Sequence, residues 1–279
     1  MDAQNDFLRA RRRAALAGLL ARLRHVPDDV RMVLPYEEVV AALGFVTERT
    51  AGTHVVALDA IVGTVDRRGE FDRRFRPTSG RARSRWESIA TAMRRGDSLP
   101  PIDVLRIGEI YFVRDGHNRV SVARALGRAD IDARVTDVIT RVGAERAITL
   151  ADLPLKGHER VFFERVPLPQ DARTEIELTD PWDYARLAES VEAWGFRTGQ
   201  EREEAISRQE TAGLWLDNEY RPVVAMLREA ELIGDRTPTE AYMRVSAQRY
   251  RLLRTHRWDE EIIQRVIEDL GRRGARRRR

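Results

Sequence analysis

The sequence predicts an α+β protein in which a mixed α/β domain is followed by a mainly helical C-terminal domain. Three observations support this class. Short β-rich segments alternate with helical patterns between residues 53 and 140. From Pro181 onward, apolar residues recur at three- and four-residue spacing. With 279 residues, of which 42% are hydrophobic and 34% charged, the chain can fold and bury one or two sizeable cores.

The N-terminal 50 residues are expected to form a helical extension. Residues 6–24 predict an amphipathic helix whose leucines gather on one side, at positions 8, 16, 19, 20 and 23. Residues 35–43 predict a second, short helix that Gly44 ends.

Residues 51–142 are expected to form the mixed α/β domain. The predicted elements, in order, are a strand at 55–61, a helix at 85–95 ended by Gly96, a hairpin of 104–105 with 110–113, a helix at 120–126 closed by Gly127, and a strand at 131–135. The hairpin turns across Ile107-Gly108-Glu109.

The remaining chain divides into three predicted segments: a β-containing linker at 143–180, a helical domain at 181–271 and an arginine-rich tail at 272–279. In the linker, β character is seen at 160–166 and 175–178, with Pro167 and Pro169 between them. Helices are predicted at 184–193, 201–216, 220–232, 237–256 and 259–271. The fourth begins with a strong signal, since Thr237, Pro238 and Glu240 form a capping pattern.

The run Asp115-Gly116-His117-Asn118-Arg119 is the strongest functional signal. It lies between a strand-like segment and a helical one, so it forms a glycine turn at a helix N-terminus. Such an N-terminus has unpaired N–H groups and partial positive charge, which favour phosphate. Arg119 could bind phosphate oxygens, and Asp115 could hold a metal or accept a proton. The alternative is an ordinary Asp-Gly turn with a surface histidine.

The order of elements around this turn resembles the ParB/sulfiredoxin superfamily, over roughly residues 53–138. Residues 55–61 resemble its opening strand, Arg74-Phe75-Arg76-Pro77 its Pro-Arg signature, and 86–95 its helix before a "Pro-Ile-x-Val" segment. ParB members carry a Gly-Glu-Arg-Arg turn where this chain has Gly116 to Arg119. His117 and Asn118 therefore replace the Glu-Arg pair.

The departures from the family pattern restrict the function that it implies. The chain has no cysteine, whereas sulfiredoxin works through a cysteine in this turn, so chemistry of that kind is excluded. An Asp-Gly-His-x-Arg turn is similar to that of the free-serine kinases of the superfamily. Other members include CTP-binding clamps and proteins described as nucleases. The resemblance thus implies nucleotide or phosphodiester chemistry.

From the turn and the resemblance we expect CTP or ATP as ligand, with Mg2+ held by Asp115, and an NTPase or phosphotransferase activity. Catalytic candidates are Asp115 and His117, with Asp66, Glu70 or Asp72 as a second carboxylate, because the kinase relatives have an acid in the preceding loop. Candidates for nucleotide or phosphate contact are Gly116, Asn118, Arg119, Ser121, Arg76, Thr78 and Ser79. For Thr78 and Ser79, capping of the next helix is the alternative.

The charge distribution indicates nucleic acid as a second partner. The net charge of +4 conceals basic ends, with six arginines in residues 1–24 and six in residues 272–279. Candidate contacts to DNA are Arg272, Arg273, Arg276 and Arg277. Residues 66–85 add eight arginines against three acids, in a window expected to lie over the nucleotide. A solvated surface is the alternative for both groups.

The sequence excludes several other classes. No apolar stretch is long enough to cross a bilayer, and the N-terminus lacks a signal-peptide core, so we expect no membrane partner and a cytoplasmic protein. The five histidines are far apart and cysteine is absent, so neither zinc nor a redox cofactor is expected. Three functions stay open: a nucleotide-driven switch on DNA, a small-molecule kinase and a non-catalytic interaction protein. A homodimer is compatible with each.

Overall fold

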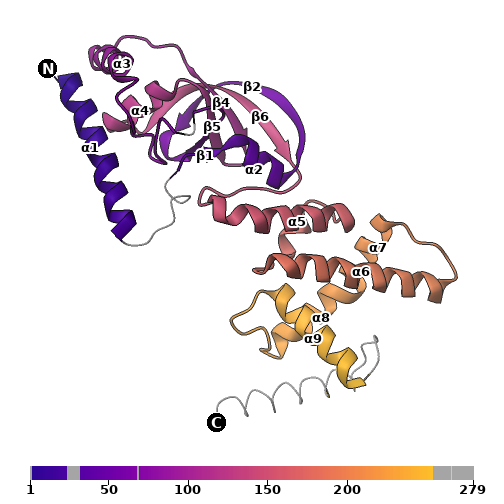
Figure 1. The fold of residues 1–279 in the computed structure, drawn as a ribbon. Coiled ribbons are helices and arrows are strands. Elements are labelled where there is room, and N and C mark those ends of the chain that lie inside the picture. The colour runs from indigo at the N-terminus through magenta and orange to yellow at the C-terminus, as the bar shows by residue number, and fades with distance from the viewer. Residues whose placement is uncertain (1, 24–31, 68, 254–264, 266–279) are drawn as a thin grey trace. The chain divides into compact units, whose positions relative to one another are not determined.

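The computed structural model describes residues 2–23, 32–67, 69–253 and 265. The chain forms two compact units, residues 1–160 and 161–279, each described here by itself. Figure 1 shows that the first combines a sheet with helices and that the second is helical, so the α+β class is confirmed. Among the described residues, no helix combines the length and the hydrophobicity that crossing a bilayer requires.

The first unit is built on a six-stranded mixed sheet with the order β1-β3-β5-β4-β6-β2. Its strands are β1 (Leu34–Pro35), β2 (Phe45–Ala57), β3 (Ile61–Thr64), β4 (Ile102–Ile107), β5 (Ile110–Asp115) and β6 (Asp130–Thr140). The predicted hairpin is confirmed, because β4 and β5 pair antiparallel with Ile107 opposite Ile110. Strand β5 also pairs parallel with β3, and β4 pairs parallel with β6, so the hairpin is central.

The opening strand predicted at 55–61 is wrong in extent. Strand β2 begins ten residues earlier, at Phe45, and runs antiparallel to β6. It stops at Ala57, where the 3-10 turn Leu58–Ala60 redirects the chain into β3. Most side chains of β2 are exposed, so the strand lacks the apolar run by which a buried strand is recognised in sequence.

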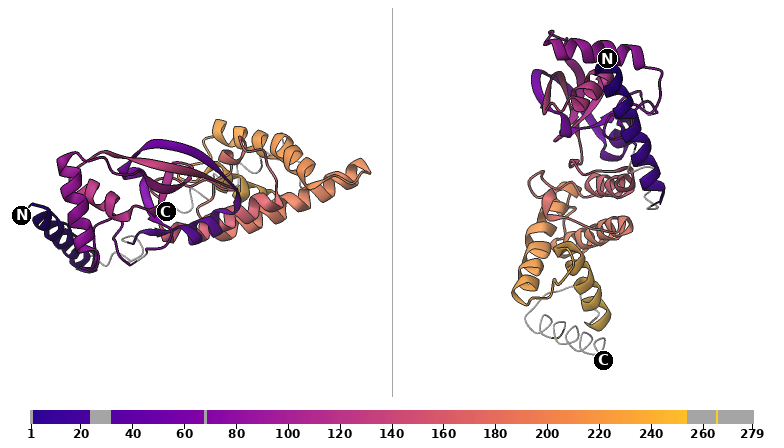
Figure 2. Two further views of the ribbon diagram at one scale, coloured as in Figure 1. Left: turned by 90° about the horizontal axis from the view of Figure 1, so that it is seen from above. Right: turned by 90° about the vertical axis from the view of Figure 1, so that its left-hand side faces the viewer.

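The described residues of this unit form α1 (Asp2–Leu23), α2 (Tyr36–Leu43), α3 (Arg83–Arg95) and α4 (His117–Ala125), besides the start of a further helix after the sheet. Figures 1 and 2 show α1 lying beside α3. Its buried residues are Phe7 and Ala10, and the Phe7 ring meets Trp86 edge to face at 5.5 Å. The leucines that predicted its amphipathic face are instead exposed.

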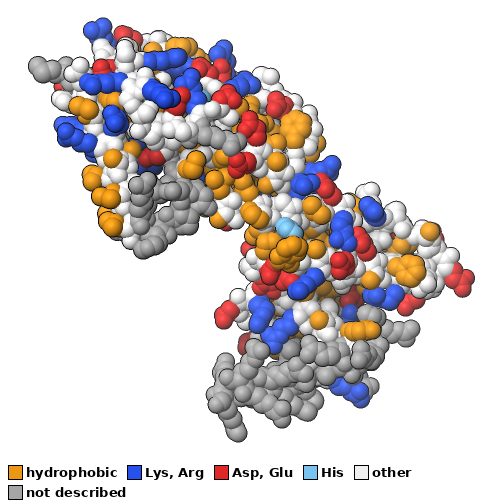
Figure 3. Space-filling model, in the orientation of Figure 1, with side chains coloured by type: hydrophobic (Ala, Val, Ile, Leu, Met, Phe, Trp, Pro, Cys, Tyr) orange, Lys and Arg blue, Asp and Glu red, His pale blue; other side chains and the backbone are white. Residues whose placement is uncertain are grey.

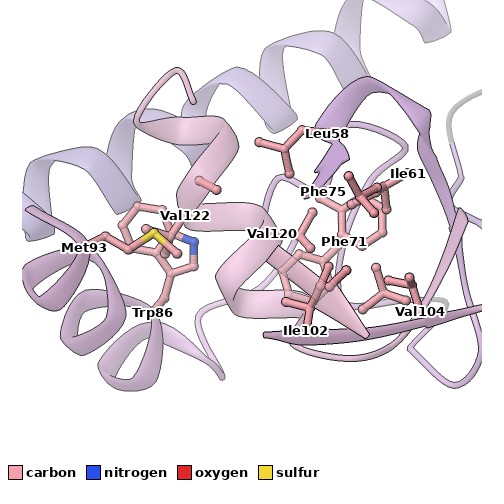
Figure 4. Close-up of a cluster of buried hydrophobic side chains, with 14 of the residues drawn as sticks. Leu58, Ile61, Phe71, Phe75, Trp86, Met93, Ile102, Val104, Val120 and Val122 are labelled. Atoms are coloured by element: carbon pink, nitrogen blue, oxygen red, sulfur yellow. The ribbon is translucent and has the colours of Figure 1, made fainter. Parts of the chain in front are cut away.

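The core of this unit lies between α3, α4 and the sheet, as Figure 4 shows. Trp86 and Met93 of α3 face Val122 of α4. On the other side of α4, Val120 packs with Ile102 of β4 and with two phenylalanines from the segment before α3. Helix α4 is therefore buried on several sides, and its N-terminal turn is held firmly.

The predicted strands at 160–166 and 175–178 are wrong. Residues Leu153–Arg165 form helix α5, and residues Arg173–Glu175 form a 3-10 turn. The reason is the spacing of the apolar residues. Phe162, Phe163 and Val166 are all buried, which is a helical i, i+1, i+4 pattern and not the alternation of a strand.

The second unit contains α6 (Pro181–Arg202), α7 (Arg208–Trp215), a π-helical turn (Leu216–Tyr220), α8 (Arg221–Glu229) and α9 (Pro238–Leu253). The predicted helix at 201–216 is wrong at its start, because α6 ends at Arg202, the next residue Glu203 is left-handed, and Ser207 caps α7. The capping pattern at Thr237 is confirmed, since Thr237 and Glu240 exchange side chain to backbone hydrogen bonds at 3.2 Å. The helix predicted at 259–271 lies outside the described residues, except Arg265.

Candidate functional site

The candidate site lies where β5 passes into α4. Gly116 adopts φ +99°, and a Cβ atom there would lie 2.4 Å from Cγ2 of Ile102. The turn therefore requires glycine both for its left-handed backbone and for its close packing. Helix α4 begins at His117, three residues before the predicted start, so His117, Asn118 and Arg119 form its first turn.

The N-terminus of α4 is open to an anion. Within the described chain, no side chain caps it and its first turn contains no acidic residue. The first intrahelical hydrogen bond runs from Val120 N to Gly116 O, so the preceding N–H groups have no partner within the helix. These groups and the helix dipole together favour a negatively charged ligand.

A cavity of about 20 Å³ adjoins this turn, which is space for roughly one water molecule. Its lining combines the turn with two further arginines and one apolar side chain: Arg67, Arg85, Ile89, Asp115, Gly116, His117, Asn118 and Arg119. The structure thus brings together all five residues of the predicted turn motif.

Arg119 is almost buried and is held by the protein's own oxygens. Its Nη2 donates to Asp115 Oδ2 at 2.6 Å, and its Nη1 donates to the carbonyls of Pro100 and, at 2.8 Å, of Pro101. The Arg119 side chain is 11% exposed and that of Asp115 is 60% exposed. Arg119 therefore fixes the chain before β4 to the α4 turn, while the Asp115 carboxylate stays open to solvent.

His117 is buried and neutral. Its Nε2 forms a 2.7 Å hydrogen bond with Thr64 Oγ1 at the end of β3, and its ring stacks near Phe71 and Phe75. Burial, reinforced by the positive charge of Arg67, lowers the pKa of His117 to about 4. At neutral pH the imidazole consequently adds no positive charge to the cavity, and it positions the first turn of α4 against the core.

The side chain of Asn118 contains a buried polar atom that makes no hydrogen bond to the described residues. Its Oδ1 has no hydrogen-bond partner among the described residues, although only 6% of the residue is exposed. Leaving such a group unpaired costs about 1–3 kcal/mol. A side-chain amide can present its oxygen, or after a flip its NH2 group, to a bound molecule. Asn118 is thus an available polar group in the cavity lining.

Two arginines of the lining were not singled out by the sequence, although both lie in the predicted arginine-rich window. Arg67 is paired with Glu70 at 2.9 Å, and its backbone N–H donates to Thr64 Oγ1 at 3.1 Å. Arg85 projects from α3, is exposed, and has no hydrogen-bond or salt-bridge partner in the described parts of the chain. The approach of Arg85 to the turn depends on the packing of α3 on α4, and that of Arg67 depends on the pairing of β3 with β5. Sequence spacing reveals neither.

Several predicted phosphate contacts lie outside the cavity lining and have other partners. Arg76 donates to Asp72 Oδ2 at 2.7 Å and to Arg13 O at 3.0 Å. Thr78 Oγ1 donates to Gly69 O at 2.7 Å, and Ser79 Oγ accepts a long hydrogen bond from Arg81 N. Ser121 is buried, and its Oγ accepts from Trp86 Nε1 at 2.9 Å.

The acidic candidates are spread around the site. Asp66, Glu70 and Asp115 each act on the pKa of His117, which places their charges in its vicinity. No group of three or more side chains that could hold a metal ion is found in the described residues. The candidate DNA contacts Arg272, Arg273, Arg276 and Arg277 lie outside the described residues.

Comparison with known proteins supports the resemblance that the turn suggested. Residues 71–150 match the family of the ParB N-terminal domain, which confirms the ParB/sulfiredoxin prediction for this part of the chain. No curated protein matches the sequence. A crystal structure of sulfiredoxin from Arabidopsis thaliana is similar with 18% identity over 30% of this chain and 82% of its own, at a TM-score of 0.24. A Pnob8-like ParB-N domain is similar with 11% identity over 81% and 84%, at a TM-score of 0.23.

Proposed function

Because residues 71–150 match the ParB N-terminal domain, we propose that the chain binds a nucleoside triphosphate, CTP or ATP, and acts as a nucleotide-driven switch on DNA. One observation carries this proposal. The uncapped N-terminus of α4 faces a cavity that the exposed Arg85 also lines. A helix N-terminus with an adjacent arginine is a favourable arrangement for phosphate oxygens.

In the proposed complex, phosphate oxygens accept hydrogen bonds from the first-turn N–H groups of α4. Arg85 supplies the compensating charge, and Arg67 adds to it from the segment after β3. Asp115, the exposed carboxylate of the turn, would hold Mg2+ together with the phosphates. When bound, Mg2+ neutralises phosphate charge. His117 keeps the turn in place, and its imidazole is uncharged at neutral pH.

The cavity of about 20 Å³ is too small for a triphosphate, so binding requires side chains to move. Arg85 is exposed and held by no salt bridge in the described residues, so it can change rotamer at little cost. Arg67 is half exposed and paired with Glu70 in a pair of small net stability. The two arginines can therefore swing outward and then close over the phosphates.

Association with DNA is supported by the charge of this unit. Arg9, Arg11, Arg12 and Arg13 lie on α1, and all four are exposed. In Figure 3, basic side chains gather where Figure 1 shows α3 and the adjacent part of α1. Contacts of this kind bind the phosphate backbone without sequence preference and weaken steeply with salt.

Isothermal titration of the full chain with CTP and with ATP, each with Mg2+, tests the nucleotide site. We expect binding of at least one nucleotide, weakened about tenfold or more by Arg85→Gln, because a charge-assisted hydrogen bond contributes about 1.5–3 kcal/mol. Arg83→Gln is the matched control, since Arg83 lies on the same helix, is paired with Glu87 and does not line the cavity. Equal affinities for Arg85→Gln and the wild type would refute the site.

A small-molecule kinase is the second candidate, favoured by the three carboxylates whose charges act on His117. A phosphotransferase needs a carboxylate to position an acceptor hydroxyl, and Asp66, Glu70 or Asp115 could do so. Phosphate release measured with and without duplex DNA, beside transfer to serine and other hydroxyl acceptors, separates the two functions. Release stimulated by DNA supports the switch, and transfer to an acceptor supports the kinase.

A further inference from the structure

A second cavity lies in the C-terminal unit, lined by described residues of α6, α9 and the turns beside them. Its volume is about 670 Å³, within the usual range of small-molecule sites. One wall comes from α6, where Asp183, Arg186, Ser190, Trp194 and Arg197 recur at helical spacing, and the opposite wall comes from α9. No residue lines both this cavity and the cavity at the α4 turn.

The wall combines apolar and cationic groups. Trp194 of α6 and Met243 and Tyr250 of α9 provide apolar surface. Five arginines and three carboxylates also line the cavity, so its charge is positive. An apolar wall with an excess of arginine suits a ligand that has both an apolar body and a negative charge.

The carboxylates of the lining already have cationic or N–H partners. Glu219 lies in the π-helical turn and accepts from Arg249 at 3.0 Å, with both side chains almost fully buried. Asp183 is paired with Arg186 at 3.1 Å. Glu240 accepts from the backbone N–H groups of Thr179 and Thr237. Because the lining contains five arginines and three carboxylates, these carboxylates neutralise only part of the positive charge of the arginines.

Arg197 lies close enough to the buried ion pair for the charges of Arg249 and Glu219 both to act on it. It is partly buried, and no carboxylate in the described residues lies within salt-bridge distance of it. Burial, together with the positive charge of Arg249, lowers its pKa, which means that its charge is unfavourable where it stands. A bound anion would remove that penalty. The adjoining π-helical turn is a rare conformation that is frequent at functional sites.

From this arrangement we propose that the cavity between α6 and α9 binds an aromatic organic anion. The anionic group, a carboxylate or a group of similar charge, pairs with Arg197, and the ring packs against Trp194 and Tyr250. Residues 272–279 carry six arginines and no acid, so the positive charge of the lining disfavours them as an occupant of the cavity.

Titration of the full chain with 8-anilinonaphthalene-1-sulfonate, an aromatic anion whose fluorescence rises in apolar surroundings, tests this proposal. We expect saturable binding that Arg197→Gln weakens about tenfold or more, the usual effect of losing a charge-assisted hydrogen bond. Arg202→Gln should leave binding unchanged, because Arg202 ends the same helix without lining the cavity. Ala247→Trp, which fills the cavity from an exposed position on α9, should abolish binding.

Competition identifies the class of ligand. We expect 2-naphthoate to displace the dye and the neutral 2-naphthalenemethanol to displace it poorly. Circular dichroism confirms that each variant is folded, since the dye also binds partly unfolded chains. Absence of saturable binding, equal binding by folded Arg197→Gln, or equal displacement by the neutral alcohol would each overturn the proposal.

Discussion

Replacement of Gly116 by alanine tests whether the α4 turn is as tightly built as its geometry indicates. The backbone at Gly116 has φ +99°, where an L-residue costs about 1–2 kcal/mol. The new methyl group would lie 2.4 Å from Cγ2 and 2.8 Å from Cβ of Ile102. Ile102 is fully buried in β4, so it has no free space into which to move. Overpacking of this kind costs about 1–3 kcal/mol more.

We therefore expect Gly116→Ala to lower the free energy of unfolding of the N-terminal unit by roughly 2–5 kcal/mol. Gly127→Ala is the matched control at the other end of the same helix. Its φ is +73°, but no neighbouring atom lies within 4 Å of the added Cβ. Gly127→Ala should lower the free energy of unfolding only by the cost of a left-handed backbone at an L-residue, about 1–2 kcal/mol.

Urea and thermal denaturation followed by circular dichroism measure both variants. Because the chain has two compact units, each transition is fitted separately. For a unit of this size, a loss of 2–5 kcal/mol corresponds to a fall in Tm of roughly 5–15 °C. Stabilities of Gly116→Ala and Gly127→Ala that agree within about 0.5 kcal/mol would refute the packing argument, because the contact with Ile102 would then cost nothing.

Two further predictions concern the buried polar groups of α4. Since the folded pKa of His117 is about 4 and the unfolded value is about 6.5, its stabilising contribution is complete above pH 6.5 and is lost as the pH falls toward 4. Between pH 7 and pH 4 we expect the free energy of unfolding to fall by roughly 3 kcal/mol, and we expect a smaller fall for His117→Gln. Urea titrations that show the same fall in both proteins would contradict this. Ser121→Ala should lower stability by about 1–3 kcal/mol, because the Trp86 indole N–H loses its acceptor in the core. Its nucleotide affinity, measured by calorimetry, should equal that of the wild type, and a selective loss of affinity would instead make Ser121 a ligand contact.

The central part of the fold could be predicted because its local signals agree with its tertiary environment. The hairpin turn at Gly108, the helix end at Gly96 and the capping pattern at Thr237 each have a local physical cause. The start of the exposed edge strand β2 could not be predicted. Most of its side chains are exposed, so no alternation of buried and exposed residues marks the length of the strand. Helix α5 was misread because β-branched and aromatic residues outweighed the spacing of its buried side chains.

The candidate site could be predicted as a segment but not as a set of contacts. A glycine turn between a strand and a helix is visible in sequence, and its five residues do line one cavity. The contacts of Arg119 with Pro100 and Pro101 depend on how the chain enters β4, which no local pattern encodes. The same holds for Arg85, whose position follows from the packing of α3 against α4.

These contacts suggest how a phosphate and a metal ion could enter the proposed site together. Asp115 neutralises Arg119, and because its side chain is 60% exposed the pair contributes little stability. An incoming phosphate carries more negative charge than one carboxylate and can replace Asp115 beside Arg119. The displaced carboxylate would then be free to hold Mg2+ together with phosphate oxygens, and the metal would neutralise phosphate charge. The two prolyl carbonyls hold Arg119 in place during this exchange, so a residue with a structural role in the free protein can also serve the ligand.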